Sequence, residues 1–185
     1  MSNTVEFRGF KDYGFFRVAN AVPVVHVANP NKNADEIIEL IGDAWVGDVQ
    51  LVVFPELCIT GYTCEDLFQR ETLLEAAKEA LNHILDKTRQ CDLISIVGMP
   101  LVVENKLFNV AVVFKKGTIL AIIPKTHLAN SVEFHEERWF KSATELPVKE
   151  LCIFGQTVPI GTDVMINVIN IPGCRIGVEI CEDGW

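Results

Sequence analysis

The chain has little positive charge and nowhere concentrates it. It contains 16 lysine and arginine residues against 25 aspartate and glutamate residues, for a formal net charge of −9. No block rich in lysine or arginine occurs along it. Proteins that bind nucleic-acid phosphates or anionic lipid surfaces depend on such blocks. We therefore expect neither a nucleic acid nor a membrane among its partners.

The chain also lacks paired cysteines and a long apolar run. Its six cysteines are irregularly spaced and form no CxxC pair. The N-terminal segment is polar and charged, and it resembles neither a secretory signal nor a membrane span. These absences predict a reduced, cytoplasmic protein whose cysteines are mostly buried apolar groups.

Several common site motifs are missing as well. The sequence has no GxGxxG, no GxxxxGK[ST], no HExxH and no GxSxG. These absences argue against a dinucleotide fold, a phosphate-binding loop, a zinc protease and a serine hydrolase of the usual types. We expect no metal site and no cofactor within this chain.

What the chain does contain indicates one α/β domain. Apolar residues make up 49% of its 185 residues, enough for a substantial core. Helical spacing occurs at 34–45, 71–90 and 133–140, the last with Asn130 and Glu133 as a weak capping box. Strands are expected at 15–28, 51–56, 92–100, 107–125, 163–172 and 175–181, with a hairpin turn at Lys116-Gly117. This order predicts a mixed sheet with antiparallel pairs.

Three reactive side chains each follow an apolar strand. Glu56 follows LVVFP, Lys125 follows LAIIP, and Cys181 follows IGVEI. Taken singly, each has a commoner structural explanation, as a turn acid, a solvated lysine or a core cysteine. Ligand sites of open α/β sheets gather at the carboxyl ends of strands. We therefore expect the three side chains to converge there.

An acid, an amine and a thiol together can hydrolyse an amide. A free thiol is mostly protonated at neutral pH, and a buried carboxylate can accept its proton. The ammonium of Lys125 and the backbone N–H of Glu182 can stabilise the oxyanion that forms when the thiolate attacks a carbonyl. This is covalent catalysis without histidine.

Glu-Lys-Cys in this chain order resembles the signature of the nitrilase, or carbon–nitrogen hydrolase, superfamily. Three longer segments are similar to the glutaminase domain of glutamine-dependent NAD synthetases: FPELCITGYTCEDLF (54–68), PKTHLANSVEFHEERWF (124–140) and IGVEICEDGW (176–185). The resemblance implies a nitrilase-type α-β-β-α sandwich that hydrolyses L-glutamine. The ammonia would pass to a C-terminal, ATP- and Mg²⁺-dependent synthetase domain that amidates deamido-NAD. It also implies a homo-oligomer.

The resemblance assigns roles to individual residues. It implies that Glu56 is the general base, Lys125 the oxyanion-stabilising cation and Cys181 the nucleophile, with Glu133 as a second carboxylate that orients the lysine. It further implies that Tyr62 and Glu182 contact the glutamine substrate. Asp183 is expected to have a structural role instead.

The sequence departs from the family in two respects. Ser131 stands where the family usually has a tyrosine six residues past the lysine, so it cannot supply that ring of the glutamine pocket. The chain also stops soon after the cysteine. We expect residues 1–185 to be a carbon–nitrogen hydrolase domain that is incomplete at its C-terminal end, with the synthetase domain absent. Two alternatives stay open: another amidase or carbamoyl hydrolase of the superfamily, and a non-catalytic fragment.

Overall fold

The protein is built on a mixed five-stranded sheet. The structure, a computed structural model, describes residues 14–169 and 171–185. The sheet order is β1-β2-β3-β4-β5, with parallel pairing from β1 to β3 and antiparallel pairing from β3 to β5. This arrangement confirms the predicted α/β fold class. The strands are β1 (Val18–Asn20), β2 (Leu51–Val53), β3 (Ile94–Val103), β4 (Lys106–Lys115) and β5 (Thr118–Pro124).

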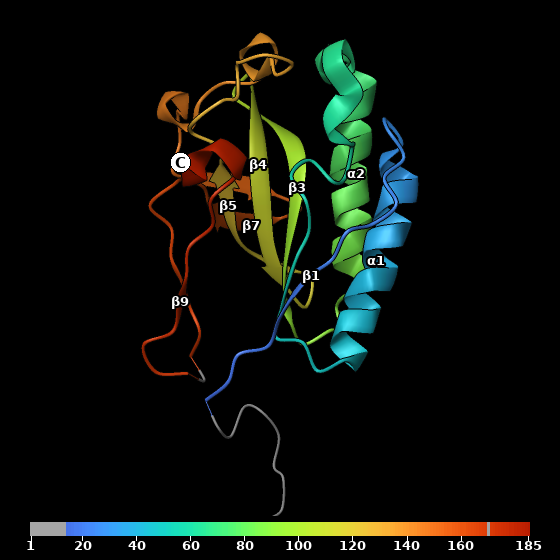
Figure 1. Ribbon diagram of the computed structural model, residues 1–185, viewed down its shortest axis with the longest axis vertical. Helices are drawn as coiled ribbons and strands as arrows, with labels where there is room; N and C mark the ends of the chain where they lie inside the picture. The colour runs from blue at the N-terminus through green and yellow to red at the C-terminus, as the bar shows by residue number, and fades with distance from the viewer. Residues whose placement is uncertain (1–13, 170) are drawn as a thin grey trace, which may run out of the picture.

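Two long helices cover one face of this sheet. Helix α1 (Pro30–Val46) and helix α2 (Glu71–Lys87) lie side by side there (Figure 1). Because side chains alternate along a strand, Val110, Val112 and Phe114 of β4 join the core beneath these helices. The helical spacing predicted at 34–45 and 71–90 is confirmed, since apolar faces of both helices fill this core.

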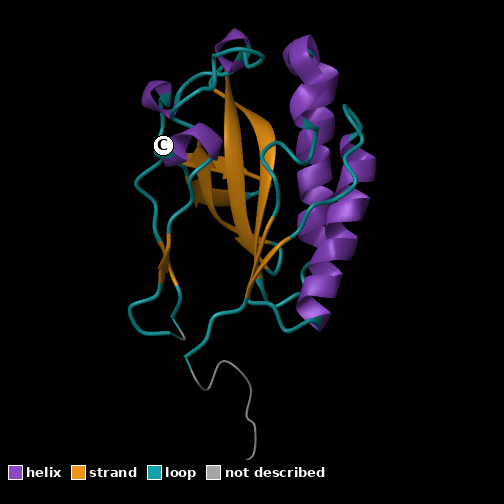
Figure 2. Ribbon diagram, in the orientation of Figure 1, coloured by secondary structure: helices purple, strands orange, loops and turns teal. Residues whose placement is uncertain are grey.

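The opposite face of the sheet carries a smaller apolar cluster. Ala111, Val113 and Ile123 meet Ile180 there, so the segment before the candidate cysteine packs on this face. The same segment contains a short hairpin of β8 (Ile166–Asn167) and β9 (Arg175–Ile176), on the side of the sheet away from the helices (Figure 2). The described residues thus form one helical layer and one sheet layer of the predicted sandwich.

Three tight turns join antiparallel strands. Each consists of two residues with positive φ: Glu104-Asn105 between β3 and β4, Lys116-Gly117 between β4 and β5, and Phe154-Gly155 between β6 (Glu150–Ile153) and β7 (Gln156–Pro159). Paired left-handed residues match the twist of a two-residue hairpin. The predicted hairpin at Lys116-Gly117 is confirmed. The turns between β3 and β4 and between β6 and β7 were not predicted from the sequence, and neither were the strands β6 and β7.

Some predicted elements are shorter than expected or differ in type. The strand expected at 15–28 is regular only in β1, and the strands expected at 163–172 and 175–181 are regular only in β8 and β9. The helix predicted at 133–140 is wrong, since this stretch contains only a short 3₁₀ turn, η3 (Glu136–Arg138). A helix capped by Asn130 would contain Val132, but Val132 has a φ of 56°, which an α-helix excludes. The side chain of Asn130 donates to Glu137 instead of capping a helix. Among the described residues, the other 3₁₀ segments are η2 (Tyr62–Gln69), η4 (Ala143–Glu145) and η5 (Cys181–Gly184).

The cysteines agree only in part with the expectation that most of them are buried. All six cysteines are unpaired, but only Cys58, Cys64 and Cys91 are buried, so the expectation of mostly buried cysteines holds for half of them. Within residues 14–169 and 171–185, no helix combines the length and the apolar character needed to cross a bilayer.

Two glycines in equivalent turns provide a matched test of the hairpins. Gly117 and Gly155 have φ values of 75° and 74°. An added Cβ at Gly155 meets nothing within 4 Å, whereas at Gly117 it would lie 2.9 Å from the carbonyl oxygen of Leu85. We expect Gly155→Ala to lower the free energy of unfolding by about 1 kcal/mol, from left-handed strain alone. Gly117→Ala should lower it further. Urea unfolding of both variants would contradict this view if the two losses were equal.

Candidate active site

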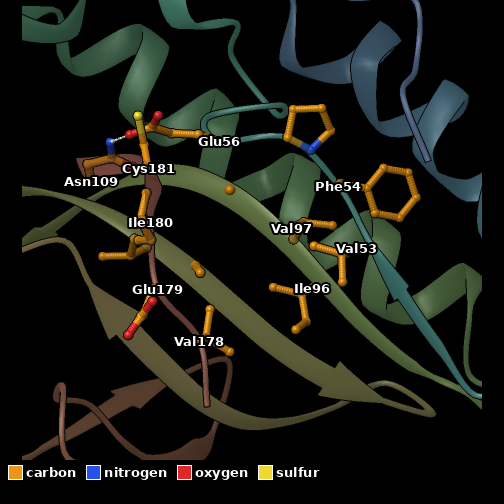
Figure 3. A pocket seen from close by; sticks show the side chains of 14 residues that line it. Val53, Phe54, Glu56, Ile96, Val97, Asn109, Val178, Glu179, Ile180 and Cys181 are labelled. Atoms are coloured by element: carbon orange, nitrogen blue, oxygen red, sulfur yellow. Dashed lines mark hydrogen bonds between the residues drawn. The ribbon is translucent and has the colours of Figure 1, made fainter. Parts of the chain in front are cut away.

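The site brings together side chains that lie just beyond β2 and β5 and in the segment that follows β9. Glu56 is in the turn after β2, Lys125 directly follows β5, and Cys181 begins η5. The Lys125 ammonium nitrogen lies 2.8 Å from Glu56 Oε1. Cys181 and Glu56 line one pocket together with Asn109 (Figure 3). The structure therefore brings these three side chains together, as the sequence predicts.

A glycine in β3 allows Glu56 to reach the other two groups. β3 and β4 separate the strands that precede Glu56 and Lys125, so the turn at Glu56 must cross β3. It does so over Gly98: an added Cβ there would collide with the backbone nitrogen of Leu57 and lie 3.0 Å from Glu56 Cα. The Ile59 N–H also donates to the Gly98 carbonyl, at 3.1 Å. A side chain at position 98 would exclude this approach.

Lys125 is the most buried charged group of the site. Its side chain is fully buried, and its nitrogen lies 2.8 Å from one oxygen each of Glu56 and Glu136. Burial by itself lowers the pKa of Lys125, but the hydrogen bonds and charges of Glu136 and Glu56 outweigh it and raise the pKa overall. The lysine is therefore a cation throughout the neutral range. Its third N–H remains available to another acceptor.

The second carboxylate beside Lys125 belongs to Glu136. Glu136 Oε1 accepts from Lys125 at 2.8 Å, and Oε2 accepts from the backbone N–H of Ala129 at 3.0 Å. The Glu136 N–H in turn donates to the Ala129 carbonyl, which closes the loop on itself. Glu133 is exposed and makes no contact with the lysine, so the prediction for Glu133 is wrong. Segment 133–140 contains three glutamates, and only this loop closure decides which of them is buried.

Tyr62 supports the same carboxylate. Its hydroxyl donates to Glu136 Oε1 at 2.6 Å, and its ring packs edge to face against Phe134 with the centroids 6.0 Å apart. Burial, and then the bond to Glu136, raise the pKa of Tyr62, so its hydroxyl stays protonated. The predicted contact of Tyr62 with substrate stays a prediction.

The Cys181 thiol lies near two carboxylates, Glu56 and Glu136, and one ammonium, Lys125. Its backbone has a φ of 48° at the sharp start of η5. Partial burial raises the pKa of the Cys181 thiol, and the carboxylates of Glu56 and Glu136 act in the same direction. Lys125 and the backbone N–H of Glu182 oppose them without reversing the shift. The thiol is thus protonated at neutral pH and needs a base to become a nucleophile.

Asp183 connects η5, which begins at Cys181, to the backbone that follows Lys125. Its Oδ1 accepts from the backbone N–H groups of Thr126 at 3.0 Å and His127 at 2.7 Å. The structural role predicted for Asp183 agrees with these bonds. Glu182 is exposed, and its predicted contact with substrate stays a prediction.

Comparison with known proteins places this arrangement in a family. The sequence model of the family described as carbon-nitrogen hydrolase matches residues 18–185. The chain belongs to the carbon-nitrogen hydrolase family. This confirms the superfamily that the order of glutamate, lysine and cysteine predicts.

The relatives of this carbon-nitrogen hydrolase include larger enzymes. The chain is 31% identical over 179 residues to the glutamine-dependent NAD(+) synthetase of Mycobacterium tuberculosis, covering 97% of this chain and 26% of that protein. A glutamine-dependent NAD(+) synthetase from Cytophaga hutchinsonii superposes with a TM-score of 0.80 at 30% identity, over 91% of this chain and 28% of that one. The chain therefore spans about a quarter of the length of these relatives.

The fold itself is shared more widely. An amidase from Nesterenkonia superposes with a TM-score of 0.59 at 22% identity, over 77% of this chain and 53% of the amidase. At that identity the likeness concerns the fold alone. It agrees with the predicted nitrilase-type architecture.

Gly98 and Gly42 provide a matched test of the Glu56 turn. Gly98→Ala forces the Glu56–Leu57 backbone away from β3, whereas an added Cβ at Gly42 in α1 meets nothing within 4 Å. We expect Gly98→Ala to cost about 1–3 kcal/mol of folding free energy. Gly42→Ala should be neutral or stabilise by up to about 1 kcal/mol. Equal unfolding midpoints in urea would show that the close approach at Gly98 is unimportant.

Glu136 and Glu133 can be compared by the same measurement. Glu136→Gln removes half of the charge compensation of the buried Lys125, so it should cost roughly 1.5–3 kcal/mol. Glu133→Gln alters an exposed carboxylate and should stay within about 0.5 kcal/mol of the parent. The reverse order of stabilities would restore Glu133 as the partner of the lysine.

Proposed function

We propose that the chain is the glutaminase part of a glutamine-dependent NAD(+) synthetase. It hydrolyses L-glutamine through a thioester on Cys181 and supplies ammonia for the ATP- and Mg²⁺-dependent amidation of deamido-NAD(+) by a separate C-terminal domain. The observation that carries this proposal is the buried ammonium of Lys125, held between Glu56 and Glu136 beside the Cys181 thiol. The similarity to NAD(+) synthetases supports the choice of glutamine.

The first half of the reaction forms the thioester. Glu56 takes the proton of the Cys181 thiol, and the thiolate attacks the carboxamide carbon of glutamine. The third N–H of Lys125 and the backbone N–H of Glu182 donate to the resulting oxyanion. The C–N bond then breaks, and the protonated Glu56 gives its proton to the leaving nitrogen. Ammonia and an acyl-enzyme result.

The second half regenerates the enzyme. Glu56 takes a proton from water, and the resulting hydroxide attacks the thioester carbon. The C–S bond breaks, the thiolate recovers the proton that Glu56 holds, and glutamate leaves. Glu136 and Tyr62 keep Lys125 in place throughout, since both bond within this cluster.

The remaining assignments follow from the chemistry of glutamine. Its α-ammonium suits an exposed carboxylate at the mouth of the site, and Glu182 next to Cys181 provides one. The phenol of Tyr62 bonds to Glu136, and Tyr62 lines a neighbouring hollow together with Phe134. We further propose that the full protein forms a homo-oligomer, as the superfamily resemblance implies.

Replacing the nucleophile provides the direct test. Cys181→Ala should reduce ammonia release from glutamine to background, because no thioester can form. Cys152→Ala alters a second exposed thiol, on β6, and should leave the rate unchanged. Ammonia and glutamate are measured together with a coupled assay.

Other outcomes of this assay distinguish the alternatives. Hydrolysis of simple amides or carbamoyl compounds in preference to glutamine would favour another amidase of the superfamily. Glutamine turnover that survives Cys181→Ala would overturn the proposed mechanism. A chain that releases no ammonia from any of these substrates would favour the non-catalytic alternative.

A further inference from the structure

One polar residue stands alone in the apolar centre of β4. Asn109 is 1% exposed, and its strand neighbours Phe108, Val110 and Ala111 are buried apolar residues. It lines the pocket that also contains Glu56 and Cys181 (Figure 3). Asn109 was not predicted as a site residue, because a lone asparagine inside a strand belongs to no recognisable motif.

Asn109 binds the carboxylate that serves as the base in the proposed reaction. Its Nδ2 donates to Glu56 Oε1 at 2.6 Å. Lys125 donates to the same oxygen at 2.8 Å. Within residues 14–169 and 171–185, no donor bonds to Glu56 Oε2. Two donors thus hold one oxygen and leave the other available to a proton.

The backbone of Asn109 joins the two groups as well. Its carbonyl accepts from the N–H of Lys125 at 2.9 Å, so the residue lies between the lysine and the glutamate. It belongs to the longest antiparallel pairing of the sheet, with Pro100 as its partner on β3. A side chain on a well-paired central strand can hold a carboxylate in one orientation more tightly than a loop can.

Folding alone does not explain an asparagine at this position. Its Oδ1 is buried and has no hydrogen-bond partner in the described structure. An unpaired buried polar atom lowers stability, and an apolar residue of similar shape would avoid that loss. The amide N–H is therefore the feature that distinguishes asparagine from leucine here.

We propose that Asn109 is a positioning residue for Glu56: it holds Oε1 so that Oε2 is the atom that takes the proton of Cys181. This inference rests on the proposed function, which makes Glu56 the base. It adds a residue that acts on the thiol through the carboxylate of Glu56.

The test compares alkylation of Cys181 by iodoacetamide across pH in the parent and in Asn109→Leu, followed by mass spectrometry. Leucine keeps the size of the side chain and removes the donor. We expect Cys181 to react on the order of tenfold more slowly near neutral pH, where the thiol needs a base. At high pH, where the thiolate forms without help, both proteins should react alike. The exposed thiol of Cys152 serves as an internal reference.

A second variant separates positioning from packing. Val113→Ala lies on the same strand and the same face and removes only buried volume. It should lower the melting temperature and leave the pH profile of Cys181 unchanged, whereas Asn109→Leu should change the profile without lowering the melting temperature. A profile of Asn109→Leu that matches the parent at every pH, or that is slowed equally at high pH, would overturn the proposal.

Glutamine assays distinguish a failure of this inference from a failure of the proposed function. If the parent hydrolyses glutamine, Asn109→Leu should lower kcat by about 10- to 100-fold and leave KM nearly unchanged. If the parent does not hydrolyse glutamine but its alkylation profile depends on Asn109, the positioning role stands and the assigned substrate is wrong.

Discussion

The buried ammonium of Lys125 is the constraint around which the site is organised. A charge at zero exposure is tolerated only with close, well-oriented counter-charges. Glu56 and Glu136 provide them, from positions 69 residues before and 11 residues after the lysine. Displacing either carboxylate leaves a buried cation under-compensated. The turn after β2 and the loop after β5 therefore depend on one another through a single amine.

The need to compensate the charge of Lys125 explains the glycine at position 98 in β3. Glu56 must cross a whole strand to reach the lysine, and it can do so only where β3 presents no side chain. Gly98 meets that need, and the side chain of Asn109 on β4 donates a hydrogen bond to the Glu56 carboxylate. The sheet thus contributes to the chemistry through one missing side chain, at Gly98, and one polar side chain, that of Asn109.

The same cluster decides how the thiol can react. Partial burial and two nearby carboxylates keep the pKa of Cys181 raised, so the residue is not a preformed thiolate. Such a thiol needs a general base that is correctly oriented and has one oxygen atom available for the proton. Of the two acids that follow the cysteine, Asp183 bonds to the backbone after Lys125. That acid aligns the nucleophile with the lysine and leaves Glu182 facing solvent.

The sequence by itself determined the α/β class, both long helices, the Lys116-Gly117 hairpin and the meeting of Glu56, Lys125 and Cys181, because periodicity and strand-end position are local signals. Tertiary structure alone decided that Glu136 rather than Glu133 meets the lysine. Several glutamates lie in segment 133–140, and a loop closed by bonds to Ala129 follows no helical period. Tertiary structure also decided the roles of Gly98 and Asn109. The close backbone approach at Gly98 and the hydrogen bond from Asn109 to Glu56, 53 residues apart, leave no pattern in the local sequence.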